Sequence, residues 1–309
     1  MSLYVDPTND LAFKKIFGDP NRSQTLIAFL NAVLDYRGPR AIAHVTIVNP
    51  SQTPRIPGFK ETLLDIKAVD QSGRQFIVEM QVEKEGGFGQ RALYYTAKSY
   101  VDQLKVAEDY EALKPVVFVG VLEFNLFPGD APTTRHLIIN QQTGEQNLSD
   151  IEFAFVELPK FKKSESQLES DLDFWLDFFK SARQREKPPS NLPATLVDAY
   201  ETAKSYAWSK EERDLYDSIS LKRGSNRNVL REAVERGVAQ GMAQGMAQGM
   251  AQGMAQGMAQ GIEQGIEQGI EQGALQTKFE LARNLRAAGM SDAQISPLTG
   301  LSLAQLQAL

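Results

Sequence analysis

Asp65, Glu79 and Gln81 are the candidate site residues of the stretch DIKAVDQSGRQFIVEMQ, which runs from Asp65 to Gln81. The runs on either side of DQSG are rich in Val, Ile and Phe, which favour strands. A three-residue loop that ends at Gly73, with this glycine in the left-handed conformation, would join them into a hairpin. The resulting register places Asp65 opposite Glu79 and Leu63 opposite Gln81. Because side chains alternate along a strand, Asp65, Glu79 and Gln81 are predicted to share one face.

Opposed carboxylates of this kind are typical of a site for a hard cation. Their Cβ atoms would be roughly 5 Å apart, where like charges destabilise a hairpin unless water, a proton or a cation separates them. Mg²⁺ prefers such oxygen ligands, and the backbone carbonyl of Met80, between the two side chains, would be a further ligand. A bound ion can polarise a phosphodiester and lower the pKa of a water. The same spacing also fits two solvent-facing strand residues, although the apolar Ile77 on that face argues against a wet surface.

The segments around the hairpin predict the elements that must position it. A capped helix is expected to end at Gly18, and a Pro/Gly loop is expected at residues 51–60. Further helices are predicted over residues 21–35 and 88–104, and strands over 42–51, 114–127, 135–140 and 151–159. The order helix, three strands, helix, strand is typical of an α/β fold, and the continuous apolar run after Lys114 predicts a central strand covered on both faces.

Four of these segments carry a resemblance to a known family. DLAFKKIFG, LLDIKAVDQSGRQFIVEMQ, RALYYTAKSYVDQL and YEALKPVVFVGVLEF follow one another within residues 4–160. Together they resemble the Rpn family of recombination-promoting nucleases and transposases, which belongs to the PD-(D/E)XK nuclease superfamily. The resemblance implies a restriction-endonuclease-like core with the order αβββαβ and a mixed sheet. The sequence pattern after this core predicts a C-terminal helical extension. It also implies a DNA endonuclease that uses Mg²⁺ or Mn²⁺, with Asp65 and Glu79 as the metal carboxylates.

Other residues near these segments are candidates for supporting roles. Gln81 stands where the wider superfamily has a Lys, and an amide can orient a water but cannot stabilise negative charge as an ammonium does. A nearby Lys or Arg would then have to supply the charge. Asp10, in the first helix, is either an extra acidic site residue or a helix cap. Arg91, Tyr95 and Lys98 share one side of the helix after the hairpin, as DNA contacts or as a solvated amphipathic face.

The second half of the chain is helical in pattern and ends in a repeat. Residues 1–160 would form the nuclease core, 161–225 a helical extension and 226–275 a repeat helix or spacer. From Gly237 to Gly273 a Gly occurs at every fourth position, ten in all. Each costs a helix about 1 kcal/mol relative to Ala, so an isolated helix is disfavoured by roughly 10 kcal/mol. The pattern favours a spacer that is helical only in part, or an arm through which the chain forms homo-oligomers.

The last segment, residues 276–309, has the pattern of a small helix-turn-helix unit with turns at AAGMS and TGLS. Such a unit can bind DNA, but no Lys or Arg follows Arg286, and phosphate contacts dominate DNA affinity. We therefore expect this segment to be a packing or dimerisation module rather than a DNA-binding module.

Composition limits the remaining classes of protein. There are no cysteines, which excludes disulfides and thiolate metal sites, and the net charge is −6. Neither a signal peptide nor a membrane span is visible, which predicts a cytoplasmic protein with no membrane partner. Two functions fit: a Mg²⁺-dependent DNA endonuclease linked to recombination or mobile elements, or a catalytically weak DNA-binding or scaffolding protein that assembles through its repeat.

Overall fold

The structure, a computed structural model, describes residues 2–52, 62–104 and 107–309. Most of the predicted Pro/Gly loop, from residue 53 to residue 60, lies outside the described residues. The chain divides into two compact units, Met1–Gly224 and Ser225–Leu309. The first unit contains the predicted site, and each unit is described by itself below.

The hairpin has the predicted register. Strand β4 (Ile66–Asp70) pairs antiparallel with β5 (Gln75–Gln81), with Val69 opposite Gln75. Gly73 has φ of 86°, the left-handed value that this turn requires, and its N–H donates to the carbonyl of Asp70. The Asp70 carboxylate accepts the N–H groups of Ser72 and Arg74, so the loop is closed by its own first residue.

A six-stranded mixed sheet surrounds this hairpin, in the order β1-β4-β5-β6-β8-β7. Strands β5, β6 and β8 are parallel, whereas the pairs β1·β4, β4·β5 and β7·β8 are antiparallel. All residues of β6 are buried, as its continuous apolar sequence predicts. The α/β class and the mixed sheet are therefore confirmed. The other strands are β1 (Val45–Val48), β6 (Val116–Leu122), β7 (Thr133–Leu137) and β8 (Ile151–Glu157).

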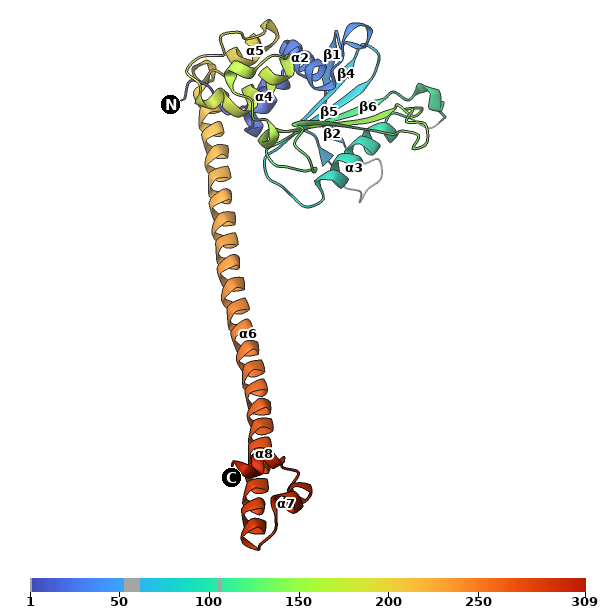
Figure 1. Cartoon of the computed structure of the whole chain (residues 1–309). Coiled ribbons are helices and arrows are strands. Elements are labelled where there is room, and N and C mark those ends of the chain that lie inside the picture. The colour runs from blue at the N-terminus through green and yellow to red at the C-terminus, as the bar shows by residue number, and fades with distance from the viewer. Residues whose placement is uncertain (1, 53–61, 105–106) are drawn as a thin grey trace. The chain divides into compact units, whose positions relative to one another are not determined.

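Helices cover both faces of the sheet (Figure 1). Phe76 and Val78 of β5 point into the main core, which they share with α1, α2, α4 and α5. Ile77 points to the opposite face, where Phe88 and Ala92 of α3 cover it. The helices are α1 (Asp10–Phe17), α2 (Ser23–Leu34), α3 (Phe88–Val101), α4 (Asp171–Ser181) and α5 (Ala194–Ala203). Short 3₁₀ helices lie at Pro20–Arg22, Gly38–Arg40, Tyr110–Ala112, Leu158–Lys160, Glu165–Gln167, Ala182–Gln184 and Ser205–Ala207.

One pairing differs from the prediction. The sequence LLDIKAV does not form one strand, because the chain bends at Asp65. Leu63 lies in β3 (Thr62–Leu63), opposite Ser51 of β2 (Ser51–Gln52) in a separate two-stranded sheet. The predicted pairing of Leu63 with Gln81 is therefore wrong. The ladder stops at Asp65 because its side chain, and not a backbone carbonyl, accepts the N–H of Met80.

Helix α6 (Lys210–Ala287) includes the whole glycine repeat. Of the two alternatives for residues 226–275, a repeat helix and a spacer that is helical only in part, the structure has the helix. A Cβ added at any glycine of the repeat would meet nothing within 4 Å, so no residue that the structure describes packs against these glycines. Neither α6 nor any other described helix is long and apolar enough to cross a membrane.

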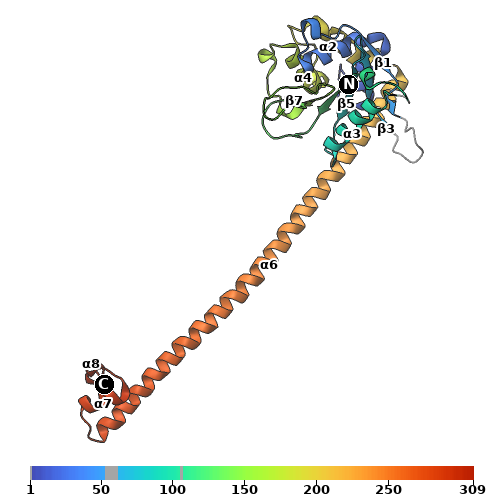
Figure 2. The same ribbon diagram turned by 90° about the vertical axis from the view of Figure 1, so that its right-hand side faces the viewer.

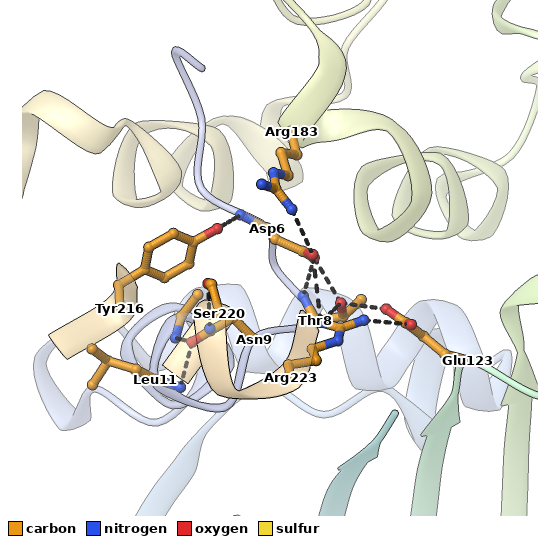
Figure 3. Close-up of polar contacts among 10 residues, drawn as sticks. Asp6, Thr8, Asn9, Leu11, Glu123, Arg183, Tyr216, Ser220 and Arg223 are labelled. Atoms are coloured by element: carbon orange, nitrogen blue, oxygen red, sulfur yellow. Dashed lines mark hydrogen bonds and ion pairs between the residues drawn. The ribbon is translucent and has the colours of Figure 1, made fainter. Parts of the chain in front are cut away.

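The base of α6, residues 210–224, belongs to the first unit and packs on its N-terminal segment. Figure 3 shows Tyr216 accepting the backbone N–H of Asp6 at 2.8 Å and Ser220 bound to the amide of Asn9. Arg223 reaches Thr8 at 3.1 Å and forms an ion pair with Glu123, the residue after β6. These contacts join the base of α6 to the segment that caps α1 and to the central strand.

The end of the second unit is a small packed cluster. Helices α7 (Asp292–Thr299) and α8 (Leu303–Gln307) pack on the last turns of α6 (Figure 2), and they bury Ala282, Ile295, Leu301 and Leu306. Gly289 and Gly300 have left-handed φ values of 88° and 70°, at the two predicted turns.

Candidate active site

Asp65 and Glu79 lie against each other at the end of the hairpin. The Asp65 N–H donates to Glu79 Oε1 at 3.1 Å, and Asp65 Oδ2 accepts the N–H of Met80 at 2.9 Å. The bend at Asp65 thus brings its carboxylate to the strand that carries Glu79. The predicted juxtaposition of the two acids is present in the structure.

Burial makes this pair electrostatically unusual. Glu79 is only 7% exposed. Its burial, and next the nearby charge of Asp65, raise the pKa of Glu79 to about 8. Burial raises the pKa of Asp65 as well, against the opposing effects of the Met80 N–H and of Lys14. Glu79 is therefore not a solvent-facing strand residue, and the alternative of a wet strand face is wrong for it.

Gln81 is held at both ends of its amide. Its Oε1 accepts a hydrogen bond from Arg91 Nη2 at 2.7 Å, and its Nε2 donates to the carbonyl of Glu83 at 3.1 Å. Arg91 also forms an ion pair with Glu85 at 2.7 Å. The amide therefore has a fixed orientation, and the guanidinium of Arg91 lies beside it.

A second cation approaches from the first helix. Lys14 Nζ lies 3.2 Å from Asp65 Oδ1 and 2.9 Å from Asp10 Oδ1. Burial lowers the pKa of Lys14, but the hydrogen bond with Asp10 and the charge of Asp65 outweigh this effect, and the pKa is raised. Lys14 is therefore a charged ammonium beside a site carboxylate.

Asp10 reaches the site through Lys14. It is not the helix cap, because the side chain of Asn9 accepts the N–H groups of Leu11 and Ala12. The capping alternative for Asp10 is therefore wrong, and its place as an extra acidic residue stays a prediction.

The three candidate DNA contacts on α3 have different surroundings. Arg91 binds Gln81, as described above. Tyr95 lies near the acids, since its pKa is raised first by burial and then by the charge of Glu79. The Lys98 ammonium donates to the backbone carbonyl of Gln52. Their contact with DNA stays a prediction, and so does the Met80 carbonyl as a metal ligand.

The donor set fits a metal of the Mg²⁺ type. Among the described residues, no group of three or more His, Asp or Glu is placed to hold a metal ion, so an ion here would rest on two protein carboxylates. Mg²⁺ usually binds proteins through one or two carboxylates, with waters and substrate phosphate completing its shell. The buried, mutually repelling Asp65 and Glu79 have this chemistry. A cation would offset both the burial of charge and the repulsion by Asp65, which together raise the pKa of Glu79.

Lys14 is the site residue that sequence reasoning missed. The only local signal is its position four residues after Asp10, which is typical of an ion pair on a helix surface. Nothing in the spacing indicates that this helix meets the start of β4. In the structure a Cβ at Gly18, the C-cap of α1, would lie 3.7 Å from Ile66, the residue that follows Asp65. This close approach places Lys14 at the acids.

Comparison with known proteins identifies the family of the chain. No curated protein and no solved structure matches the chain. Residues 7–233, however, match the family model described as PD-(D/E)XK nuclease family transposase. The match includes α1, the hairpin, α3 and the base of α6. With most of its length covered, the chain belongs to the PD-(D/E)XK nuclease family of transposases.

Proposed function

We propose that this protein is a Mg²⁺-dependent DNA endonuclease that hydrolyses phosphodiester bonds, with its active site at Asp65 and Glu79. The observation that carries the proposal is the buried Glu79 carboxylate beside Asp65, with its pKa raised to about 8. Such a pair costs stability in the absence of a cation, and proteins retain such costs mainly at functional sites. Membership of a nuclease family makes DNA the expected substrate.

Each residue of the site has a role in this proposal. Asp65, Glu79 and the Met80 carbonyl would hold Mg²⁺ or Mn²⁺, which polarises the phosphate and makes a bound water more acidic. Gln81, fixed by Arg91, would orient the attacking water. In hydrolysis a water oxygen bonds to phosphorus and one ester P–O bond breaks. One water proton passes to solvent, and the leaving oxygen takes up a proton.

The setting we propose is recombination or the movement of a mobile element, in line with the transposase description of the family. A second function, a catalytically weak DNA-binding or scaffolding protein that assembles through its repeat, is favoured by Gln81 in place of a Lys. The presence of Lys14 Nζ 3.2 Å from Asp65 favours the nuclease, because it brings an ammonium to the acids.

The proposed function is tested by the metal dependence of DNA nicking. We expect the full chain to convert supercoiled plasmid to nicked circles in Mg²⁺ or Mn²⁺, and to stop when EDTA removes the ion. Restoring Mg²⁺ should restore the rate. Cleavage that is unchanged in EDTA, or no cleavage at any millimolar concentration of either ion, would contradict the proposal.

Replacing Gln81 tests its role in orienting water. Gln81→Ala should slow cleavage about 10- to 100-fold with the fold intact, because Arg91 and the water lose a fixed partner. Gln81→Lys should keep or raise the rate, since it restores the superfamily's charge while Arg91 keeps Glu85. Single-turnover rates, with circular dichroism as a check of the fold, measure both. Equal rates for Gln81→Ala and the wild type would show that the amide has no part in the chemistry.

A further inference from the structure

We infer that Lys14 supplies, from the first helix, the positive charge that Gln81 cannot supply from β5. In this role its ammonium contacts the phosphate that undergoes hydrolysis and stabilises the negative charge that develops on it. The inference rests on the proposed nuclease function. Its first support is position, since Lys14 Nζ lies 3.2 Å from Asp65 Oδ1 although the two residues come from separate elements.

The second support is the surroundings of the side chain. Lys14 is 38% exposed, so its ammonium lies at the mouth of the site between the buried acids and solvent. Asp65 is 16% exposed and Glu79 is 7% exposed, so of these three side chains Lys14 is the most open to an approaching phosphate. From this position the Lys14 ammonium can move from Asp10 to a phosphate oxygen and stay at the surface of the protein.

The third support is that α1 is held in place by contacts that do not involve Lys14. Asn9 caps the helix and donates its side-chain amide to Ser220 at 3.2 Å (Figure 3). The next residue, Lys15, pairs with Glu212 of α6, where its ammonium lies 4.9 Å from the centre of the Trp208 ring. The two adjacent lysines thus contact different acids, Asp65 for Lys14 and Glu212 for Lys15, so Lys15 is a matched control for Lys14.

The alternative for Lys14 is that it only neutralises Asp10 and Asp65 when no metal is bound. The two roles predict different relations between metal affinity and rate. A neutralising Lys14 competes with the ion, so its removal should tighten metal binding and leave cleavage equal or faster. If Lys14 instead acts on the phosphate, its removal should keep or raise the affinity for the metal but lower the cleavage rate.

The experiment compares the full-length wild type with Lys14→Gln, Lys14→Arg and Lys15→Gln. Mn²⁺ affinity is measured by calorimetry, and the cleavage rate is measured at saturating Mn²⁺ in a single turnover. We expect Lys14→Gln to bind Mn²⁺ at least as tightly as the wild type and to cleave about 100- to 1000-fold more slowly, the usual cost of losing one group that stabilises transition-state charge. Lys14→Arg should recover most of that loss, and Lys15→Gln should cleave like the wild type.

Three results would overturn the inference. Equal cleavage by Lys14→Gln and the wild type would show that the charge is not needed. A parallel loss of Mn²⁺ affinity and rate would show that Lys14 only positions Asp65. If the wild type binds Mn²⁺ but does not cleave, the proposed function fails and the role of Lys14 fails with it. In the first two results the nuclease function stands.

Discussion

Glu79→Gln is expected to stabilise the metal-free protein and to abolish its cleavage. Glu79 is buried, and its pKa is raised to about 8 from the usual 4.5 of a Glu. A carboxyl group whose pKa is higher in the folded state costs no stability below pH 4.5, where both states are protonated. The cost grows as the pH rises from 4.5 to about 8, because the unfolded chain ionises first, and it is complete above that range.

Gln has nearly the shape of Glu and can still accept the Asp65 N–H, but it has no charge to bury. At pH 8 and without metal, we expect Glu79→Gln to raise the free energy of unfolding by about 3 kcal/mol. At pH 4.5 the gain should be close to zero. Thermal unfolding in EDTA at both pH values measures this, with the exposed Glu145→Gln as the matched control. A variant that is less stable than the wild type at pH 8, or a gain independent of pH, would contradict a destabilising buried charge at Glu79.

The same substitution removes half of the protein charge available to the metal. Affinity for Mg²⁺ or Mn²⁺ should fall steeply, because a neutral amide oxygen is a weaker ligand than a carboxylate. We expect cleavage to fall by at least about 1000-fold, the scale of removing a main electrostatic contributor. A substitution that raises stability and lowers activity is typical of a functional residue that destabilises the fold.

Truncation of α6 after Arg223 is expected to leave the first unit stable, whereas truncation before Tyr216 is expected to destabilise it. A chain of residues 1–225 keeps the contacts that Tyr216, Ser220 and Arg223 make with the core, and we expect it to fold and to cleave DNA at high protein concentration. A chain of residues 1–209 loses Tyr216, Ser220 and Arg223. It loses the ion pair between Arg223 and Glu123, and breaking a largely buried pair costs about 3 kcal/mol or more.

Thermal unfolding and single-turnover cleavage of both truncated chains test this expectation. The 1–225 chain should melt close to the first transition of the full protein. Its apparent mass in light scattering should be smaller, and its rate should be lower at dilute protein, if the repeat assembles the chain. The 1–209 chain should melt several degrees lower. A 1–225 chain that is folded and metal-bound yet inert would show that the repeat or the tail contributes to the active site or to DNA docking.

Local sequence patterns were sufficient for the hairpin and its acids. The turn chemistry at Gly73 and the alternation along β5 predicted the register, and through it the meeting of Asp65 with Glu79. The continuous apolar run of β6 predicted a central strand for the same reason, since a strand covered on both faces has no polar side. These features depend on neighbours that are close in sequence.

Features that depend on distant residues could not be predicted. Lys14 meets Asp65 only because α1 packs against the start of β4, and a single sequence does not show that contact. Leu63 left the predicted register because the side chain of Asp65 replaced a ladder carbonyl. The helix of the repeat was disfavoured by summing the cost of its glycines, yet α6 continues through them from a base that the core holds.

The most direct measurement of the central proposal is the nicking of supercoiled plasmid in Mg²⁺ by the wild type and by Asp65→Ala. Asp130→Ala, at an exposed loop position, is the matched control for loss of an acid. We predict Mg²⁺-dependent nicking by the wild type and by Asp130→Ala, and a loss of at least about 1000-fold in Asp65→Ala with its fold intact by circular dichroism. Nicking by Asp65→Ala at the wild-type rate would contradict an active site at Asp65 and Glu79.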